Sequence, residues 1–307
     1  MQIPLAPIDT EPVRVTRPRV HEGAGVPGEI ERELEESFEL VAAPGDADGV
    51  VVTPAVTVDA AYLEAAGPQL RIVANYAVGI DNVDLDAARE RGVVVSNTPG
   101  VLTNATAEHA IALVLSLLRR IGEGDRSLRR RDTWEWGPDF MVGESLEGKE
   151  VLVVGPGRIG RRVAELATAH GARPTFAGRG DDLLPLLAVA DVVTVHCPLT
   201  PETRHLVGAA ALEAMKPTAV LVNTARGQVV DEAALAAALQ AGAIAGAALD
   251  VFEREPAVSE VLLAMENVVL TPHIASATRE TRLAMGMLVV SALRAVLLEG
   301  RAPPNAV

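Results

Sequence analysis

The segment VLVVGPGRIG, residues 151–160, constrains the possible folds of this chain more than any other. Its four apolar residues predict a buried strand, and residues 161–170 predict a helix. Between them, Gly155, Gly157 and Gly160 have the G-x-G-x-x-G spacing, which allows a tight turn, close approach of backbone to phosphate, and packing of helix on strand. Free N–H groups and the dipole at a helix N-terminus attract phosphate. The segment therefore favours a dinucleotide site over a purely structural turn.

Size and composition favour a compact chain of two domains. The sequence has 307 residues, of which 49% are hydrophobic, and we find no uninterrupted apolar stretch of 18 residues. The first 15 residues lack a basic stretch followed by an apolar one, so we expect no signal peptide. Cys197 is the only cysteine, which excludes an intrachain disulfide and a multi-cysteine metal site. We expect a cytoplasmic protein without a membrane partner.

The net charge of −14 argues against nucleic acid as a partner, because binding to phosphate backbones requires a basic face. We also find no cluster of His, Asp and Glu with the spacing of a metal site. The expected partner is a small molecule, together with a second copy of the chain for the reason given below.

Alternating strands and helices predict an α/β protein with two doubly wound parallel sheets. We expect a discontinuous, flavodoxin-like substrate domain and a Rossmann cofactor domain, the first formed by residues 1–100 plus 278–307 and the second by residues 101–277. Strands expected in the first are 13–15, 39–42, 49–53, 70–74 and 93–96. Strands expected in the second are 151–154, 174–177, 192–196, 219–224, 244–250 and 267–270. The final helix, 278–298, is expected to return to the first domain.

A long apolar helix is predicted from residue 104 to 121, with Thr103 and Asn104 as candidate caps. Because this helix is apolar on nearly all sides, it needs cover on both faces, which favours a homodimer. The basic run 126–131 is expected to be a solvated helix face. The aromatic residues Trp134, Trp136 and Phe140 follow; they either pack in a loop or dimer contact, or form a wall of a small-ligand pocket.

Three loops that follow predicted strands carry residues suited to hydride-transfer chemistry. Arg226, in residues 223–227, can hold a carboxylate through two parallel hydrogen bonds. His273, in residues 271–275, is a suitable proton donor at neutral pH. A carboxylate from residues 250–256 could fix the tautomer of this histidine and raise its pKa. Each residue alone is ordinary, but together in the sheet of the glycine loop they form a candidate active site.

The chain resembles the D-2-hydroxyacid dehydrogenase family, and within it the glyoxylate/hydroxypyruvate reductase branch. The resemblance covers roughly residues 70–277 and rests on several motifs in the same order. These are NYAVGIDNVDL (75–85), GVVVSNTPGVLTNATAEHA (92–110), GPGRIG (155–160), NTARGQVVDEAAL (223–235), ALDVFEREP (248–256) and NVVLTPHIASAT (267–278).

The resemblance implies that Arg226 binds the substrate carboxylate, that His273 donates a proton to the carbonyl oxygen, and that Glu255 pairs with His273. It also implies that backbone N–H groups at Val78 and Gly79 bind the substrate, and that Trp136 contacts it. The residues expected to bind the cofactor are Thr103, Gly155, Pro156, Gly157, Arg158, Ile159, Gly160, Gly178, Arg179, Gly180, His196, Cys197, Pro198, Thr224, Ala225, Asp250, His273 and Ala275.

The sequence departs from the family pattern in two places on the adenine side of the cofactor. No carboxylate occurs near Gly178, where an NAD-type acid would meet the ribose, whereas Arg179 could meet a 2′-phosphate. We therefore expect NADPH, with NADH as the alternative if Asp181 or Asp182 reaches back. Only residues 180–190 separate Arg179 from the next strand, so we expect the sheet to lack one strand that relatives have.

The leading prediction is an NADPH-preferring reductase of glyoxylate or hydroxypyruvate that forms D-2-hydroxy acids. One alternative is a D-2-hydroxyacid or 3-phosphoglycerate dehydrogenase that uses NAD. Another is a cofactor-sensing interaction protein of the same fold. We expect Cys197 not to be a catalytic thiol, since hydride transfer requires no nucleophile, and His109 to be packed or interfacial.

Overall fold

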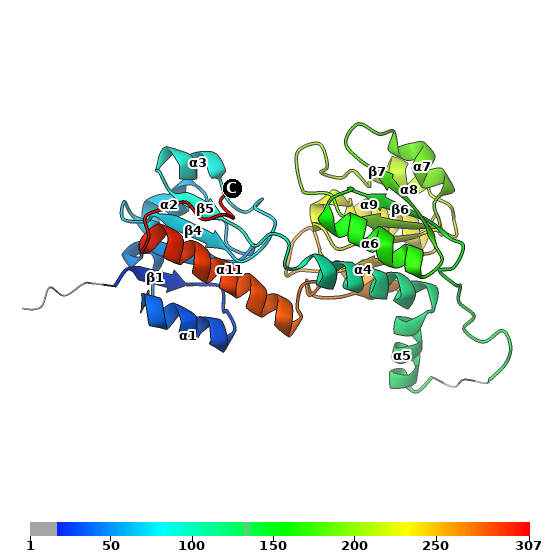
Figure 1. The fold of residues 1–307 in the computed structure, drawn as a ribbon. Helices are drawn as coiled ribbons and strands as arrows, with labels where there is room; N and C mark the ends of the chain where they lie inside the picture. The colour runs from blue at the N-terminus through cyan, green and yellow to red at the C-terminus, as the bar shows by residue number, and fades with distance from the viewer. Residues whose placement is uncertain (1–16, 133, 135) are drawn as a thin grey trace, which may run out of the picture. The chain divides into compact units, whose positions relative to one another are not determined.

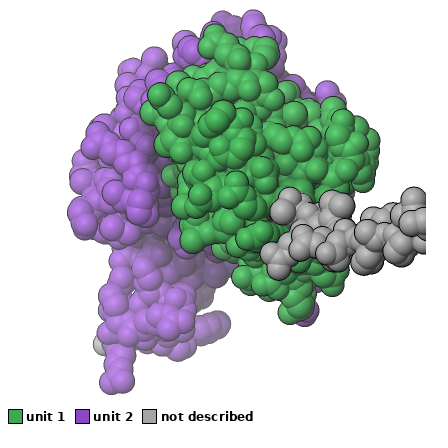
Figure 2. Space-filling view, turned by 90° about the vertical axis from the view of Figure 1, so that its left-hand side faces the viewer, with its two compact units in different colours: residues 1–97, 286–307 green, residues 98–285 purple. Residues whose placement is uncertain are grey.

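The computed structural model describes residues 17–132, 134 and 136–307, and the chain divides into two compact units. Unit 1 comprises residues 1–97 and 286–307, and unit 2 comprises residues 98–285 (Figure 2). The chain therefore passes from one unit to the other twice, and the second passage lies within a helix. The boundaries predicted from the sequence, after residues 100 and 277, differ from these by three and eight residues.

Unit 1 contains a five-stranded parallel sheet in the order β2-β1-β3-β4-β5, which is the flavodoxin-like order (Figure 1). Its strands are β1 (Arg19–Glu22), β2 (Glu39–Val41), β3 (Gly49–Val52), β4 (Ile72–Asn75) and β5 (Val94–Ser96). Its helices are α1 (Gly28–Ser37), the 3-10 helix η1 (Pro44–Asp46), α2 (Ala60–Ala66), α3 (Leu85–Glu90) and α11 (Arg279–Leu297), which starts in unit 2. The strand predicted at 13–15 lies outside the described residues, and β1 was not predicted.

The C-terminal helix α11 is part of the core of unit 1. A Cβ atom on Gly49, at the start of β3, would lie 2.9 Å from Leu293 Cδ2 of this helix. Arg71 Nη2 donates a 2.6 Å hydrogen bond to the carbonyl of Val296 near the end of the helix. The last residues then run beside β5, where Val307 N donates to the carbonyl of Val95. The two chain segments of unit 1 thus form one core.

Unit 2 contains a six-stranded parallel sheet in the order β11-β10-β9-β8-β6-β7. Its strands are β6 (Glu150–Val154), β7 (Arg173–Ala177), β8 (Val192–Val195), β9 (Val220–Asn223), β10 (Gly246–Leu249) and β11 (Val268–Leu270). Its helices are α4 (Thr103–Leu118), α5 (Ile121–Arg130), α6 (Arg158–Ala169), α7 (Leu183–Val189), α8 (Ala209–Ala214), the 3-10 helix η2 (Gly227–Val229), α9 (Glu232–Gln240) and α10 (Glu260–Leu263). All six predicted strands are confirmed in chain order.

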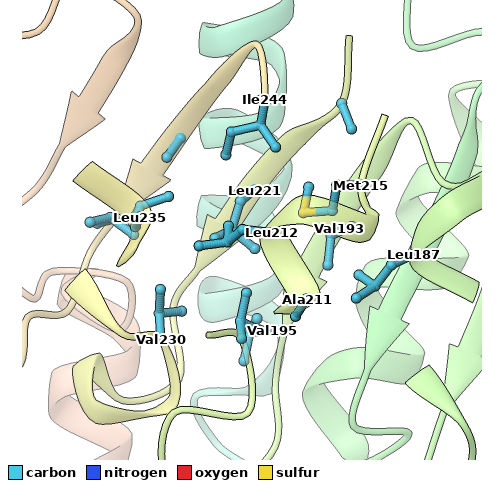
Figure 3. Close-up of a cluster of buried hydrophobic side chains, with 14 of the residues drawn as sticks. Leu187, Val193, Val195, Ala211, Leu212, Met215, Leu221, Val230, Leu235 and Ile244 are labelled. Atoms are coloured by element: carbon cyan, nitrogen blue, oxygen red, sulfur yellow. The ribbon is translucent and has the colours of Figure 1, made fainter. Parts of the chain in front are cut away.

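Both faces of the unit 2 sheet are covered by helices, as a doubly wound sheet requires. Helices α4 and α6 pack on one face (Figure 1) around a buried cluster that includes Val114, Val153 and Val163. Helices α7, α8 and α9 cover the other, where Leu212 and Leu221 belong to a second cluster (Figure 3). The predicted fold class, two parallel-sheet α/β domains, is therefore confirmed.

The start and end of α4 differ from the sequence-based expectation. The N-cap residue is Leu102, and no side chain caps the helix, so the capping assigned to Thr103 and Asn104 was wrong. The Asn104 side chain instead donates to Glu108 and accepts from Arg162. The helix ends at Leu118, and Arg120, with a left-handed φ of 54°, separates it from α5.

The strand β7 lies at one edge of its sheet, with β6 as its sheet neighbour. Only the short helix α7 stands between β7 and β8 in the chain. Residues 180–190 thus add no strand to the sheet, as expected, and the comparison with relatives stays a prediction. Among the described residues, no helix combines the length and apolarity that a bilayer crossing requires.

Candidate active site

The glycine loop between β6 and α6 has room for a ligand at one glycine only. A Cβ atom on Gly155 would lie 2.6 Å from Cys197 N, and one on Gly160 would lie 2.2 Å from the Gly155 carbonyl oxygen. A Cβ atom on Gly157, the N-cap of α6, would meet no protein atom within 4 Å. The first and third glycines are thus required by the protein's own packing, whereas Gly157 leaves open space at a helix N-terminus. This arrangement fits a dinucleotide pyrophosphate.

The loop 196–198, which follows β8, lies directly against the glycine loop. Strands β6 and β8 are neighbours in the sheet, and the chain leaves them toward opposite edges, which is the usual ligand position in such sheets. Burial lowers the pKa of His196 to about 3, and Thr194 Oγ1 lies 2.8 Å from its Nε2. Burial also raises the pKa of the Cys197 thiol to about 11. At neutral pH both residues therefore shape the loop without carrying charge.

A carboxylate lies at the end of β7, although the strand itself ends without one. The chain turns at Gly180, with a φ of 89°, and Asp181 Oδ2 accepts a 2.7 Å hydrogen bond from Gly178 N. Asp182 instead caps α7, because its carboxylate accepts a hydrogen bond from Leu184 N. Arg179 is exposed beside this turn. Both an arginine and a carboxylate are therefore present at the strand end where the adenosine ribose is expected.

His273 and Glu255 form a hydrogen-bonded pair within unit 2. His273 Nδ1 lies 2.8 Å from Glu255 Oε2, and both side chains are just over one-third exposed. Burial alone would raise the pKa of Glu255. The hydrogen bonds from His273 and from Phe252 N, with the positive charges of His273 and Arg226, outweigh burial and hold this pKa below its usual value. The carboxylate is thus ionised at neutral pH and engages Nδ1, which leaves Nε2 as the ring nitrogen for a substrate.

Arg226 lies next to this pair because the backbone after β9 packs on the backbone after β10. A Cβ atom on Gly227 would lie 1.9 Å from the carbonyl carbon of Phe252, so the two chain segments are in direct contact. Asn223 Nδ2 donates a 2.8 Å hydrogen bond to the Arg226 carbonyl oxygen, which holds the backbone of this loop. The three residues predicted to be catalytic therefore lie on neighbouring loops.

The buried carboxylate of Asp250 holds the loop that carries His273. Its Oδ1 accepts from Ile274 N at 2.9 Å, and its Oδ2 accepts from Ala275 N at 2.8 Å. Its main-chain oxygen accepts from His273 N at 2.8 Å. These bonds surround His273, whose φ of 54° is a conformation that costs most residues about 1 to 2 kcal/mol. Asp250 supports this loop, and its contact with the cofactor stays a prediction.

The remaining predicted site residues have defined local positions, and their ligand contacts stay predictions. Val78 and Gly79 belong to unit 1, where Asn97 Nδ2 and Asn75 Nδ2 donate to their respective carbonyl oxygens. Trp136 is 83% exposed. Thr103 is the first residue of α4, and Arg158 and Ile159 begin α6, after Pro156. Pro198 follows Cys197 in the loop after β8. After β9, Thr224 Oγ1 lies 3.5 Å from His196 Nδ1, and Ala225 N donates to Asn223 Oδ1.

The sequence analysis expected His109 of α4 to be packed or interfacial, but it did not foresee a contact near this site. Its Nε2 lies 3.1 Å from Thr271 Oγ1 and 3.4 Å from Asp250 Oδ1. Packing of α4 on the ends of β10 and β11 brings these residues together; each lies in a quoted motif, but the motifs do not show that their side chains meet. In the described part of the chain, no group of three or more His, Cys, Asp or Glu residues could hold a metal ion.

A glycine loop at the reversal point of a parallel sheet, with an acid–base pair in the same unit, defines an NAD(P)-dependent oxidoreductase. Residues 111–275 match the family described as D-isomer specific 2-hydroxyacid dehydrogenase, NAD binding domain. The chain therefore belongs to the D-isomer specific 2-hydroxyacid dehydrogenase family, as the motifs in its sequence predict.

Relatives and solved structures of this family cover most of the chain. A glyoxylate reductase of Aeropyrum pernix is 46% identical over 286 residues, which cover 87% of this chain and 85% of the relative. One from Pyrococcus furiosus is 45% identical over 296 residues, with 91% and 87% covered. The structure of an NADPH-dependent glyoxylate/hydroxypyruvate reductase of Sinorhizobium meliloti, in complex with NADP and malonate, is similar with a TM-score of 0.84. Its sequence is 38% identical, and the match covers 95% of this chain and 97% of that one.

Proposed function

We propose that this protein reduces small 2-keto acids, with glyoxylate and hydroxypyruvate foremost, to D-2-hydroxy acids and prefers NADPH as the reductant. The observation that carries the proposal is the 2.8 Å contact between His273 Nδ1 and Glu255 Oε2, with Arg226 close by. Reduction of a 2-keto acid needs a proton donor for the keto oxygen and a cation for the substrate carboxylate. His273, held by Glu255, can be the first, and Arg226 can be the second. The names of the relatives support glyoxylate as a substrate.

Each residue of the trio has a distinct task in this reaction. The guanidinium of Arg226 binds the substrate carboxylate and orients the keto group. His273, protonated on both nitrogens, donates its Nε2 proton to the carbonyl oxygen, while ionised Glu255 stabilises the imidazolium and fixes the ring. When bound, the nicotinamide supplies the hydride. Val78 and Gly79 contribute backbone N–H groups to the substrate, and Trp136 is a wall of the pocket.

The preference for NADPH rests on Arg179. The side chain is exposed directly after β7, where its cation can meet a 2′-phosphate. The Sinorhizobium relative, described as NADPH-dependent, supports this assignment. NADH is the second candidate, because the Asp181 carboxylate at the same strand end could accept hydrogen bonds from an unphosphorylated ribose. The two residues favour different cofactors, so their variants can decide.

The first test is the initial rate of NADPH and NADH oxidation with glyoxylate and with hydroxypyruvate. The proposal predicts rapid turnover of at least one acid with NADPH and slower turnover with NADH. The matched control is the His273→Asn variant, which should be slow in every combination. Binding of NADPH without turnover of either acid would instead favour a dehydrogenase of another substrate, including 3-phosphoglycerate, or a cofactor-sensing protein.

Replacing Arg179 by alanine is expected to raise the KM for NADPH by roughly 10-fold or more. The reason is that the variant loses a charge-assisted contact to the 2′-phosphate, which contributes about 1.5 to 3 kcal/mol. The KM for NADH should change little. The control is Asp181→Asn, which removes the charge beside the ribose and should weaken NADH more than NADPH. Initial rates at varied NADPH and NADH concentrations give both KM values, and fluorescence titration gives the corresponding dissociation constants. An unchanged NADPH affinity in Arg179→Ala would contradict the proposed role of this residue.

We also propose a homodimer that forms through the long apolar helix, here α4, and the arm after it, which includes α5. No residue of α5 is buried in the single chain, and Ile121 and Leu128 are 58% and 64% exposed. Sedimentation equilibrium at micromolar concentration should give twice the 32.1 kDa chain mass, and Leu128→Asp should shift the protein toward monomer. A monomeric wild-type protein would refute this assembly. We retain the expected cytoplasmic location and the absence of nucleic-acid and membrane partners as part of the proposal.

A further inference from the structure

A side-chain network lies behind the loop that carries His273. It consists of His109 on α4, Asp250 after β10 and Thr271 after β11. The carboxylate of Asp250 is fully buried, and the His109 side chain is 20% exposed. None of these side chains needs to contact a substrate for the arrangement to influence the reaction, because the Asp250 carboxylate bonds to the two backbone N–H groups that directly follow His273.

The direction of the hydrogen bonds follows from the groups involved. Thr271 Oγ1 lies 2.6 Å from Asp250 Oδ1, and since an ionised carboxylate only accepts, the hydroxyl must donate its proton there. The hydroxyl oxygen is then an acceptor for His109 Nε2 at 3.1 Å. The same ring nitrogen lies 3.4 Å from Asp250 Oδ1, so a proton on Nε2 points toward both oxygens. His109 is thus an N–H donor that completes the network.

The network controls the loop through its acceptors. When His109 holds Thr271, the Asp250 carboxylate stays oriented toward the backbone of the next loop. There it accepts hydrogen bonds from Ile274 N at 2.9 Å and from Ala275 N at 2.8 Å. These two N–H groups follow His273 directly and fix the left-handed turn at that residue. Without the donor at His109, the threonine hydroxyl and the carboxylate could each rotate, and the loop would sample additional positions.

We propose that His109 is a positioning residue for the reaction: its Nε2–H group holds Thr271 and Asp250 so that His273 stays aligned for proton transfer. The proposal rests on the proposed function, in which His273 is the proton donor. His109 itself does not touch the reacting atoms. Loss of its donor should therefore lower kcat while leaving cofactor binding and global stability nearly unchanged.

The test compares His109→Leu, which has similar bulk but no donor, with His109→Gln, whose side-chain amide can place an N–H near the same point. We expect His109→Leu to lower kcat about 10-fold, within the 10²-fold that a 1 Å misplacement can cost, and His109→Gln to recover most of it. The KM for the keto acid and the NADPH affinity should stay within about twofold of wild type. Tm should stay within a few degrees of wild type. Wild-type kcat in His109→Leu, or failure of His109→Gln to recover activity, would overturn the proposal.

Thr271→Val provides a second, independent variant if His109→Leu does not fold. It should show the same loss of kcat, and in the double variant the two losses should not add, because both substitutions break one network. Wild-type kcat in Thr271→Val would overturn the proposal.

A readout without substrate separates this proposal from the proposed function. Proton–nitrogen spectra of the histidine rings, assigned with His273→Asn among the six histidines, report the tautomer of His273. We expect one sharp set of His273 ring signals in the wild type, with a proton on Nδ1 toward Glu255, and broadened or multiple signals in His109→Leu. An unchanged His273 signal would overturn the positioning role, even if the wild-type protein reduced neither glyoxylate nor hydroxypyruvate.

Discussion

Replacement of His273 by asparagine is expected to lower kcat for keto-acid reduction by about 10² to 10⁴, the usual contribution of a positioned general acid. Asparagine tolerates the left-handed backbone of this position better than most residues, so the loop should keep its shape. Its amide can form hydrogen bonds but cannot transfer a proton. Steady-state rates with glyoxylate and NADPH measure the effect, while cofactor affinity should remain within about twofold of wild type.

Glu255→Gln is the companion variant, because it keeps the shape of the pair and removes the charge. We expect a smaller loss than in His273→Asn, since the proton donor remains. The pKa of Glu255 is held below its usual value, so the carboxylate contributes stability above the unfolded pKa and loses it as pH falls through the lowered value. An equal Tm for the wild type and Glu255→Gln at neutral pH, with equal kcat, would contradict the role of this pair.

Gly157→Ala is expected to leave the protein folded but to weaken NADPH binding roughly 100-fold, or about 2.7 kcal/mol. Gly157 has a φ of −73°, which alanine adopts readily, and a methyl group there would meet no protein atom within 4 Å. The methyl group would instead occupy the space that we assign to the pyrophosphate. Fluorescence titration with NADPH gives the affinity, and thermal unfolding without cofactor gives the stability.

The matched control is Gly160→Ala in the same loop. A Cβ atom there would lie 2.2 Å from the Gly155 carbonyl oxygen, so the protein itself must distort. We expect Gly160→Ala to lower Tm without cofactor, with a cost of about 1 to 3 kcal/mol typical of overpacking. If Gly157→Ala lowered Tm as much as Gly160→Ala and bound NADPH normally, the open side of the loop would not be the phosphate site.

The features that the sequence predicted correctly are those encoded by local patterns. Each strand of the unit 2 sheet is a short apolar run, and the glycine spacing lies between one such run and a helix. By contrast, β1 has the sequence RVHE, with one apolar residue in four. It forms a strand because β2 and β3 pair with it on both sides, which is a tertiary effect. The chain's own composition at that point gives no signal for a strand.

Other features depended on side chains that meet only in the folded protein. Thr103 and Asn104 are of residue types that often cap helices. Asn104 instead bonds to Arg162 on the neighbouring helix α6. Asp181 follows β7 by four residues, and only the turn at Gly180 brings its carboxylate back to the strand end. For the three residues predicted to be catalytic, the motifs named the residues, while the structure supplied the contact between His273 and Glu255 and the proximity of Arg226.

The discontinuity of unit 1 has a consequence for how the protein acquires its structure during synthesis. The five strands of unit 1 are synthesised before unit 2, but most of α11, which packs on β3 at Gly49, is synthesised after it. Unit 2 is a single continuous segment and can close its core earlier, since domains generally fold as units. The nascent first sheet must therefore keep one apolar face uncovered while about 190 further residues are translated. During that interval the N-terminal segment is the part of the chain most in need of protection from aggregation.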